Sequence, residues 1–282
     1  MASSRTHSQL WPEGKHQSIE ELVSALSDDD PFVRQRAGQD LLHVSQRLQR
    51  RGRLTDLGLR MAINRADLLL RLVTEAQQAN AQGRAAIAEC LGRWRYVRAS
   101  PVLLSLLSDG EPLVRASAAL ALGESGDTSA CESLHFTLGD DSLWVRKATA
   151  DALGSLGMDQ SGTVLAMALD QEDQPLVRSS IVSALGHINT PAARNTLTGA
   201  LEDPDPTLRW HAARSLAAMG NVGALPLLKS LATDEAMLYD QTIGEMATKA
   251  ISAIEKRERG PFRTLLKTLY ALKHRIAKLR RR

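Results

Sequence analysis

The chain has few of the residues that usually build an active site. Aromatic residues make up 4% of its 282 residues, and only two cysteines occur, Cys90 and Cys131. The two cysteines lie far apart and match no metal-ligand spacing, so we expect them to be small packing residues. No Walker loop, glycine-rich dinucleotide fingerprint or nucleophile elbow occurs. The sequence therefore gives no sign of a nucleophile, metal or nucleotide site of its own.

Long hydrophobic runs are also missing. No stretch approaches the roughly 18 uninterrupted apolar residues of a membrane span, and the first residues, "MASSRTHSQLWPEGKH", contain no hydrophobic signal core. We therefore expect a cytoplasmic protein whose residues 1–17 form a flexible N-terminus.

An arginine recurs through most of the chain. The intervals are 31, 31, 32 and 31 residues between Arg84, Arg115, Arg146, Arg178 and Arg209. A leucine stands seven residues after each arginine, and the four later arginines follow an aliphatic residue, at Val114, Val145, Val177 and Leu208. The positions one before and three, four and seven after the arginine share one helical face. Each copy therefore predicts a helix with that face in the core, while the arginine itself is expected to pair with the aspartate of an adjacent turn.

Each of these helices has predicted ends. Acidic residues or serine stand ahead of the helix and can accept hydrogen bonds from its free amides, at Asp109, Asp140, Ser142, Asp203 and Asp205. Proline suits the first position, at Pro112, Pro175 and Pro206, and glycine closes the helix at Gly126, Gly157 and Gly220. Another apolar run precedes each such helix, at residues 101–107, 161–169 and 224–231. Each unit is therefore expected to be two antiparallel helices.

A single hairpin cannot bury its own apolar face, whereas stacked hairpins can. The sequence therefore predicts an all-α fold, a HEAT-like α-α superhelix that forms one continuous curved solenoid over residues 18–255. An earlier copy has its arginine at Arg34, and the longer gap from there to Arg84 predicts a helical insertion at about residues 46–82.

The positive charge is concentrated at the C-terminus. Residues 256–282 hold eleven Lys and Arg against one acid, a net of +10 where the whole chain has +3. Their apolar residues lie on one helical stripe, so a basic amphipathic helix is expected. We favour a helix that caps the last repeat. Docking to an acidic partner or to an anionic membrane surface is an alternative, and nucleic acid is not the expected partner.

Candidate site residues come from the face opposite the core, at one, two, five and nine positions after the arginine. In the later copies this face carries Lys147, Asp151, His187, Trp210, His211 and Arg214. Since second helices usually line the concave side of such solenoids, we expect these residues to share one groove in which the tryptophan is exposed. The alternative is ordinary variation of a solvent-facing surface.

The copies resemble those of a known family. The segments "EPLVRASAALALGESGD", "DSLWVRKATADALGSLGMD", "QPLVRSSIVSALGHIN" and "LRWHAARSLAAMG" are similar to the HEAT-like repeats of E/F-type phycobilisome lyases. That family attaches bilins to phycobiliproteins or removes them. The resemblance covers about residues 30–235 and departs from the family at Arg214 and Ser215, where further aromatic residues would be expected.

The resemblance implies a bilin lyase or lyase subunit that assists attachment of a linear tetrapyrrole to a cysteine of a phycobiliprotein. Because the acceptor supplies the nucleophile, no metal, nucleophile or permanently bound cofactor is required. The implied partners are a phycobiliprotein subunit and a second HEAT-repeat chain in a heterodimer. The implied roles are catalysis by Asp151 and substrate binding by Lys147, His187, Trp210, His211 and Arg214. The alternative is a non-catalytic HEAT-repeat scaffold for protein–protein interaction.

Overall fold

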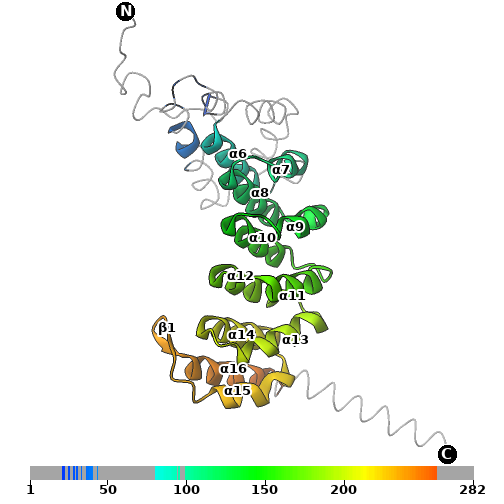
Figure 1. The fold of residues 1–282 in the computed structure, drawn as a ribbon, viewed down its shortest axis with the longest axis vertical. Helices are drawn as coiled ribbons and strands as arrows, with labels where there is room; N and C mark the ends of the chain where they lie inside the picture. Colours follow the sequence, from blue (N-terminus) through cyan, green and yellow to red (C-terminus); the bar gives the residue numbers. More distant parts are fainter. Residues whose placement is uncertain are drawn as a thin grey trace, which may run out of the picture. The chain divides into compact units, whose positions relative to one another are not determined.

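The computed structural model describes residues 80–93, 95 and 99–258, together with scattered positions between residues 21 and 43 (Figure 1). The predicted N-terminus, nearly all of the insertion at about 46–82, Arg34 and residues 259–282 lie outside the described residues. The chain forms two compact units, residues 1–161 and 162–282, which we call unit 1 and unit 2.

Unit 1 consists of stacked helical hairpins. Its helices are α6 (Ala81–Arg93), α7 (Ser100–Leu106), α8 (Pro112–Ser125), α9 (Cys131–Thr137) and α10 (Leu143–Leu156), with the short 3-10 helix η3 (Thr128–Ala130) before α9. The second helices α6, α8 and α10 pack side by side, and α7 and α9 each pack against the helix that follows (Figure 1).

Unit 2 continues the pattern. It contains α11 (Ser161–Gln171), α12 (Pro175–Leu185), α13 (Pro191–Gly199), α14 (Pro206–Met219), α15 (Leu225–Leu231) and α16 (Ile243–Glu258), with 3-10 helices η4 (Ala200–Glu202) and η5 (Val222–Ala224). A small antiparallel hairpin of β1 (Met237–Leu238) and β2 (Gln241–Thr242) separates α15 from α16. The predicted all-α fold of stacked hairpins is confirmed, and α16 takes in the first three residues of the predicted C-terminal helix. In the described part, no helix has the length and apolar character needed to cross a membrane.

The predicted core positions are buried in both units. The aliphatic residues that directly precede the arginines are fully buried, at Val114, Val145, Val177 and Leu208. The leucines seven residues after the arginines are also fully buried, at Leu91, Leu122, Leu153, Leu185 and Leu216. The closing glycines are also confirmed. Gly126, Gly157 and Gly220 have φ values of 76°, 62° and 70°, the left-handed conformation that favours glycine.

A further glycine, eight residues after the arginine, has a different role. A Cβ atom at Gly92 would lie 2.5 Å from the Cα of Ala121, and one at Gly123 would lie 2.6 Å from the Cα of Ala152. These alanines belong to the next second helix of the stack. The glycines therefore allow neighbouring helix backbones to approach closely, which no residue with a side chain permits.

The repeated arginines join successive turns. Arg84 pairs with Asp109 and Arg115 with Asp140, each at 2.7 Å, and the later pairs Arg178–Asp203 and Arg209–Asp234 are 2.8 and 2.7 Å apart. In each of these pairs the aspartate stands 25 residues after the arginine. The predicted arginine–aspartate pairing is confirmed at these four positions.

The same aspartates organise the turns themselves. One carboxylate oxygen of Asp109, Asp140 and Asp203 accepts the backbone N–H two residues later, and Asp205 accepts from the amide of Thr207 in α14. The predicted serine cap was wrong. Ser142 stands at the N-cap of α10, but its side chain makes no cap bond, because the turn is held through its amide by Asp140.

Candidate functional site

The six predicted site residues divide between the two units. Lys147 and Asp151 lie on α10 in unit 1. The other four lie in unit 2, with His187 two residues after the end of α12 and with Trp210, His211 and Arg214 on α14. A single groove that contains all six stays a prediction.

The predicted exposed face was partly wrong. The positions two after the arginine are buried in most copies, at Ala86, Ser117, Ala148 and Ser180. In a stack, each second helix is covered by its neighbours as well as by its own partner, so the buried arc is wider than the core of one hairpin. Positions two before the arginine are instead exposed, at Leu113, Trp144 and Leu176.

These exposed positions complete a row on α10. Trp144, Lys147 and Asp151 are spaced three and four residues apart, which places them on one helical face. The Trp144 side chain is 61% exposed, and the half-buried Lys147 Nζ lies 2.6 Å from Asp151 Oδ2. An aromatic ring, a cation and a carboxylate therefore stand together on one helix, which we call the α10 row.

The neighbouring helix extends the apolar part of this surface. Leu113 and Leu120 occupy on α8 the repeat positions that Trp144 and Asp151 occupy on α10. Both leucines are exposed, and the two helices pack directly on one another. Exposed apolar side chains on neighbouring helices can mark surfaces that bind ligands or proteins.

Trp210 does not have the predicted exposure. Its side chain is only 8% exposed, and the ring of Tyr239 from the β1–β2 hairpin stands edge-on to it at 5.4 Å. The ring of His211 also meets it edge-on at 5.0 Å, and the guanidinium of Arg214 lies 5.1 Å from its centroid. We call these four residues the Trp210 cluster, because each of the other three contacts the indole.

Two ring nitrogens of the cluster are buried without hydrogen bonds. Trp210 Nε1 and His211 Nδ1 have no partner among the described residues. A buried polar group without a partner costs about 1–3 kcal/mol. Burial lowers the pKa of His211 below its usual value and the nearby Arg214 lowers it further, while Asp205 opposes the shift. This shift favours the neutral form of the imidazole.

Arg214 adds a positive charge to this region. Arg214 is exposed and its guanidinium donates to Ser183 Oγ at 3.3 Å. His187 is also exposed. The Trp210 cluster thus combines the guanidinium of Arg214 with the ring nitrogens of Trp210 and His211.

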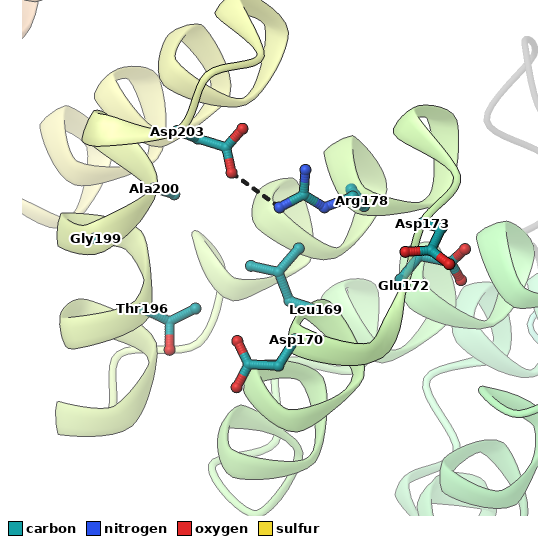
Figure 2. A pocket seen from close by; sticks show the side chains of 9 residues that line it. All are labelled: Leu169, Asp170, Glu172, Asp173, Arg178, Thr196, Gly199, Ala200 and Asp203. Atoms are coloured by element: carbon teal, nitrogen blue, oxygen red, sulfur yellow. Dashed lines mark hydrogen bonds and ion pairs between the residues drawn. The ribbon is translucent and has the colours of Figure 1, made fainter.

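A cavity of about 530 Å³ lies elsewhere in unit 2. Figure 2 shows the four carboxylates that line it from different sides, Asp170, Glu172, Asp173 and Asp203, and the ion pair of Asp203 with Arg178. None of the six predicted site residues lines it. Its excess of carboxylates disfavours an anionic ligand, so this cavity is not the predicted site.

The cysteines are packing residues, as predicted. Cys90 and Cys131 are both buried and carry free thiols. Burial raises the pKa of both thiols, most strongly that of Cys90. Neither is suited to nucleophilic chemistry, since the thiolate is the reactive form. Among the residues that the structure describes, no group of three His, Cys, Asp or Glu side chains could hold a metal ion.

Comparison with known proteins gives one named relative and several solved structures. The uncharacterized phycocyanin operon protein Z of Pseudanabaena tenuis (strain PCC 7409) is 26% identical over 160 residues, which is 54% of this chain and 78% of the relative.

Two solved structures share the fold. The complex of CpcE and CpcF of phycocyanin lyase from Nostoc sp. PCC7120 has 17% identity and a TM-score of 0.50, covering 86% of this chain and 96% of that chain. The YibA protein of E. coli has 18% identity and a TM-score of 0.53, covering 85% of this chain and 93% of that chain.

The resemblance of the repeats to HEAT-like phycobilisome lyases is confirmed by these similarities. The model of HEAT repeats matches residues 69–135, 126–186 and 168–247, which together span more than half of the sequence. The chain belongs to the HEAT-repeat family.

Proposed function

We propose that the chain is a bilin lyase or a subunit of one, which assists covalent attachment of a linear tetrapyrrole to a cysteine of a phycobiliprotein. Support comes from a relative named after the phycocyanin operon and from the fold shared with a phycocyanin lyase complex. The observation that carries the proposal is the α10 row.

Each side chain of the α10 row matches one part of a linear tetrapyrrole. The flat conjugated body requires an aromatic or apolar wall, which Trp144 and the adjacent Leu113 provide. A propionate requires a cation, for which Lys147 is available, and the pyrrole N–H groups require an acceptor, for which Asp151 is available. The Lys147–Asp151 pair is partly exposed, and such pairs contribute at most about 1 kcal/mol. Separating the pair to admit a ligand therefore costs little.

We assign the catalytic role to Asp151. Its carboxylate would hold the protonated pyrrole nitrogens, and a protonated tetrapyrrole is more electrophilic toward a thiolate. The acceptor protein supplies that thiolate, since Cys90 and Cys131 of this chain are buried. The chain's contribution is then to bind, orient and polarise the bilin without a nucleophile of its own.

We also propose a second HEAT-repeat chain as partner. The similar solved structure is a complex of two chains, CpcE and CpcF. An open row on the surface of one helix covers only one side of a flat ligand, whereas small-molecule sites usually bury most of the ligand surface. A second chain would supply the missing wall.

Covalent chromophore on the acceptor tests the function. The chain is co-expressed with a bilin pathway and a phycobiliprotein subunit, with and without a candidate partner chain, and zinc-enhanced fluorescence is read after denaturation. Wild type should label the acceptor, while Trp144→Ala and Asp151→Asn should each reduce labelling about tenfold or more. Phe136→Ala is the matched control, because this aromatic residue is 79% exposed but lies on the first helix α9.

Two results would contradict the proposal. Absence of labelling under every combination would exclude lyase activity. Wild-type labelling by both α10 variants would remove the α10 row from the mechanism.

The second candidate is a non-catalytic scaffold for protein–protein interaction. Exposed Leu113 and Leu120 beside Trp144 favour it, because such a surface also suits an amphipathic helix of a partner. A colourless purified chain that forms a stable complex with a protein, and labels no acceptor, would support this function instead.

A further inference from the structure

The β1–β2 hairpin is built as a short projection with fixed ends. At its base, the amide of Ile243 donates to the carbonyl of Ala236, and that of Gly244 to the carbonyl of Asp234, both at 2.9 Å. Thr242 and Glu245 cap α16 reciprocally, each side chain accepting from the backbone amide of the other. The end of the hairpin next to α16 is therefore anchored.

The tip of the hairpin is held much less firmly. Its two strands have two residues each, and isolated two-stranded ribbons are at best marginally stable. Tyr239 at the tip has a φ of 57°, which is uncommon for a residue other than glycine. Its side chain is 73% exposed, although its ring contacts Trp210. None of the hydrogen bonds at the base involves Tyr239, and Lys249 Nζ of α16 also donates to Gln241 Oε1 at 2.6 Å. Displacement of Tyr239 from α14 would leave these bonds in place.

The indole that Tyr239 contacts belongs to a group of polar side chains. Trp210 is more than nine-tenths buried, and its Nε1, which can only donate, has no partner among the described residues. His211 Nδ1, which can donate when it carries the ring proton, likewise lacks a partner in the described part of the chain. Arg214 adds a cation beside the same indole. These N–H groups and the guanidinium suit a ligand that carries a carboxylate, and the indole suits a flat ring next to that carboxylate.

We propose that the Met237–Thr242 hairpin is a flap over a second tetrapyrrole-binding site, formed by Trp210, His211 and Arg214, which takes a carboxylate of the ligand. In the closed state Tyr239 occupies the position of the ligand's ring against the indole. When the flap opens, the carboxylate reaches Arg214 and the donors beneath. This proposal rests on the proposed function, because it assigns the ligand to the same chemical class.

Equilibrium binding to the full chain tests the flap. The probes are biliverdin, a linear tetrapyrrole with two carboxylates, and its dimethyl ester, each titrated while visible circular dichroism is recorded. All titrations are made in the Trp144→Ala background, so that the α10 row does not dominate the signal. Melting temperatures of all variants are compared to confirm folding.

Two variants should respond in different ways. Arg214→Gln removes the cation at an exposed position, so it should weaken biliverdin binding about tenfold and leave ester binding unchanged. Tyr239→Gly removes the competing ring and suits the positive φ, so it should strengthen binding of both probes by a factor of about 3–10. Met237→Ser is the matched control, because Met237 is an exposed residue of the same hairpin and should leave binding unchanged.

The possible results test the flap site and the proposed lyase function independently. Equal weakening of acid and ester by Arg214→Gln would overturn the carboxylate assignment. Unchanged or weaker binding by Tyr239→Gly would overturn the flap, and absence of binding by either probe would overturn the site. Each of these results leaves the lyase proposal standing if the acceptor is still labelled covalently, whereas absence of labelling contradicts the lyase proposal alone.

Discussion

Replacement of Gly123 by alanine should destabilise unit 1, although alanine is the better helix former. The new Cβ atom would lie 2.6 Å from the Cα and 2.9 Å from the Cβ of Ala152 on α10. Carbon atoms pack favourably at about 3.5–4.0 Å, so α8 and α10 would have to move apart by about 1 Å. Because the nearest atom belongs to the backbone, no change of rotamer relieves the contact.

The size of the effect follows from two opposing terms. Overpacking of a buried contact costs about 1–3 kcal/mol, whereas exchange of glycine for alanine within a helix gains up to about 1 kcal/mol. We therefore expect the free energy of unfolding to fall by about 1–2 kcal/mol.

Urea denaturation followed by circular dichroism at 222 nm measures this loss. Gly110→Ala is the control, because a Cβ there meets no atom within 4 Å. If Gly123→Ala is as stable as wild type or more stable, the close approach of α8 and α10 does not limit stability and no overpacking occurs there.

Three further predictions concern charge and burial. The hydrogen bond from Arg84 lowers the pKa of Asp109, so its contribution to stability is complete above the unfolded-state pKa of about 4 and is lost below it. Asp109→Asn should therefore lower stability at pH 7 and flatten the loss on acidification, as measured by urea denaturation between pH 3 and 7. Trp210→Ala should cost about 3–5 kcal/mol because the ring is buried, whereas Trp144→Ala should change stability by less than about 0.5 kcal/mol; similar losses in both would contradict the burial assignment. Since burial lowers the folded-state pKa of His211, the unfolded chain binds the proton first, and stability should fall as the pH drops below about 6.5. His211→Gln should remove that component, and an identical pH profile for this variant would show that the imidazole does not titrate as expected.

The helices and their core could be predicted because both follow from residues close together in the sequence. The position of Leu153 seven residues after Arg146 places it on the core face by helical period alone, and it is fully buried. The arginine–aspartate pairs could also be anticipated, because the repeat places an aspartate near each turn.

The site was harder to predict because exposure depends on neighbours that are distant in sequence. The ring of Trp210 contacts Tyr239, which lies 29 residues later in a hairpin too short to show an alternating pattern. The role of Gly123 depends on Ala152 of the next repeat. The exposed position of Trp144, in contrast, could have been found from the sequence. The apolar residues Leu113, Trp144 and Leu176 recur two places before the arginine, opposite the core, where polar residues would be expected.

The offset of 25 residues between the paired arginine and aspartate limits which insertions and deletions the repeats can accept without losing an ion pair. Removing residues 85–115, one complete period of 31, would bring Asp140 to 25 residues after Arg84, because the original separation is 56. The shortened chain would keep an ion pair at that joint, whereas loss of two or three residues within the segment would move the carboxylate out of reach. The array can therefore gain or lose whole repeats more easily than fractions of one. Its length can change by duplication while the joints that carry an arginine–aspartate pair keep that pair.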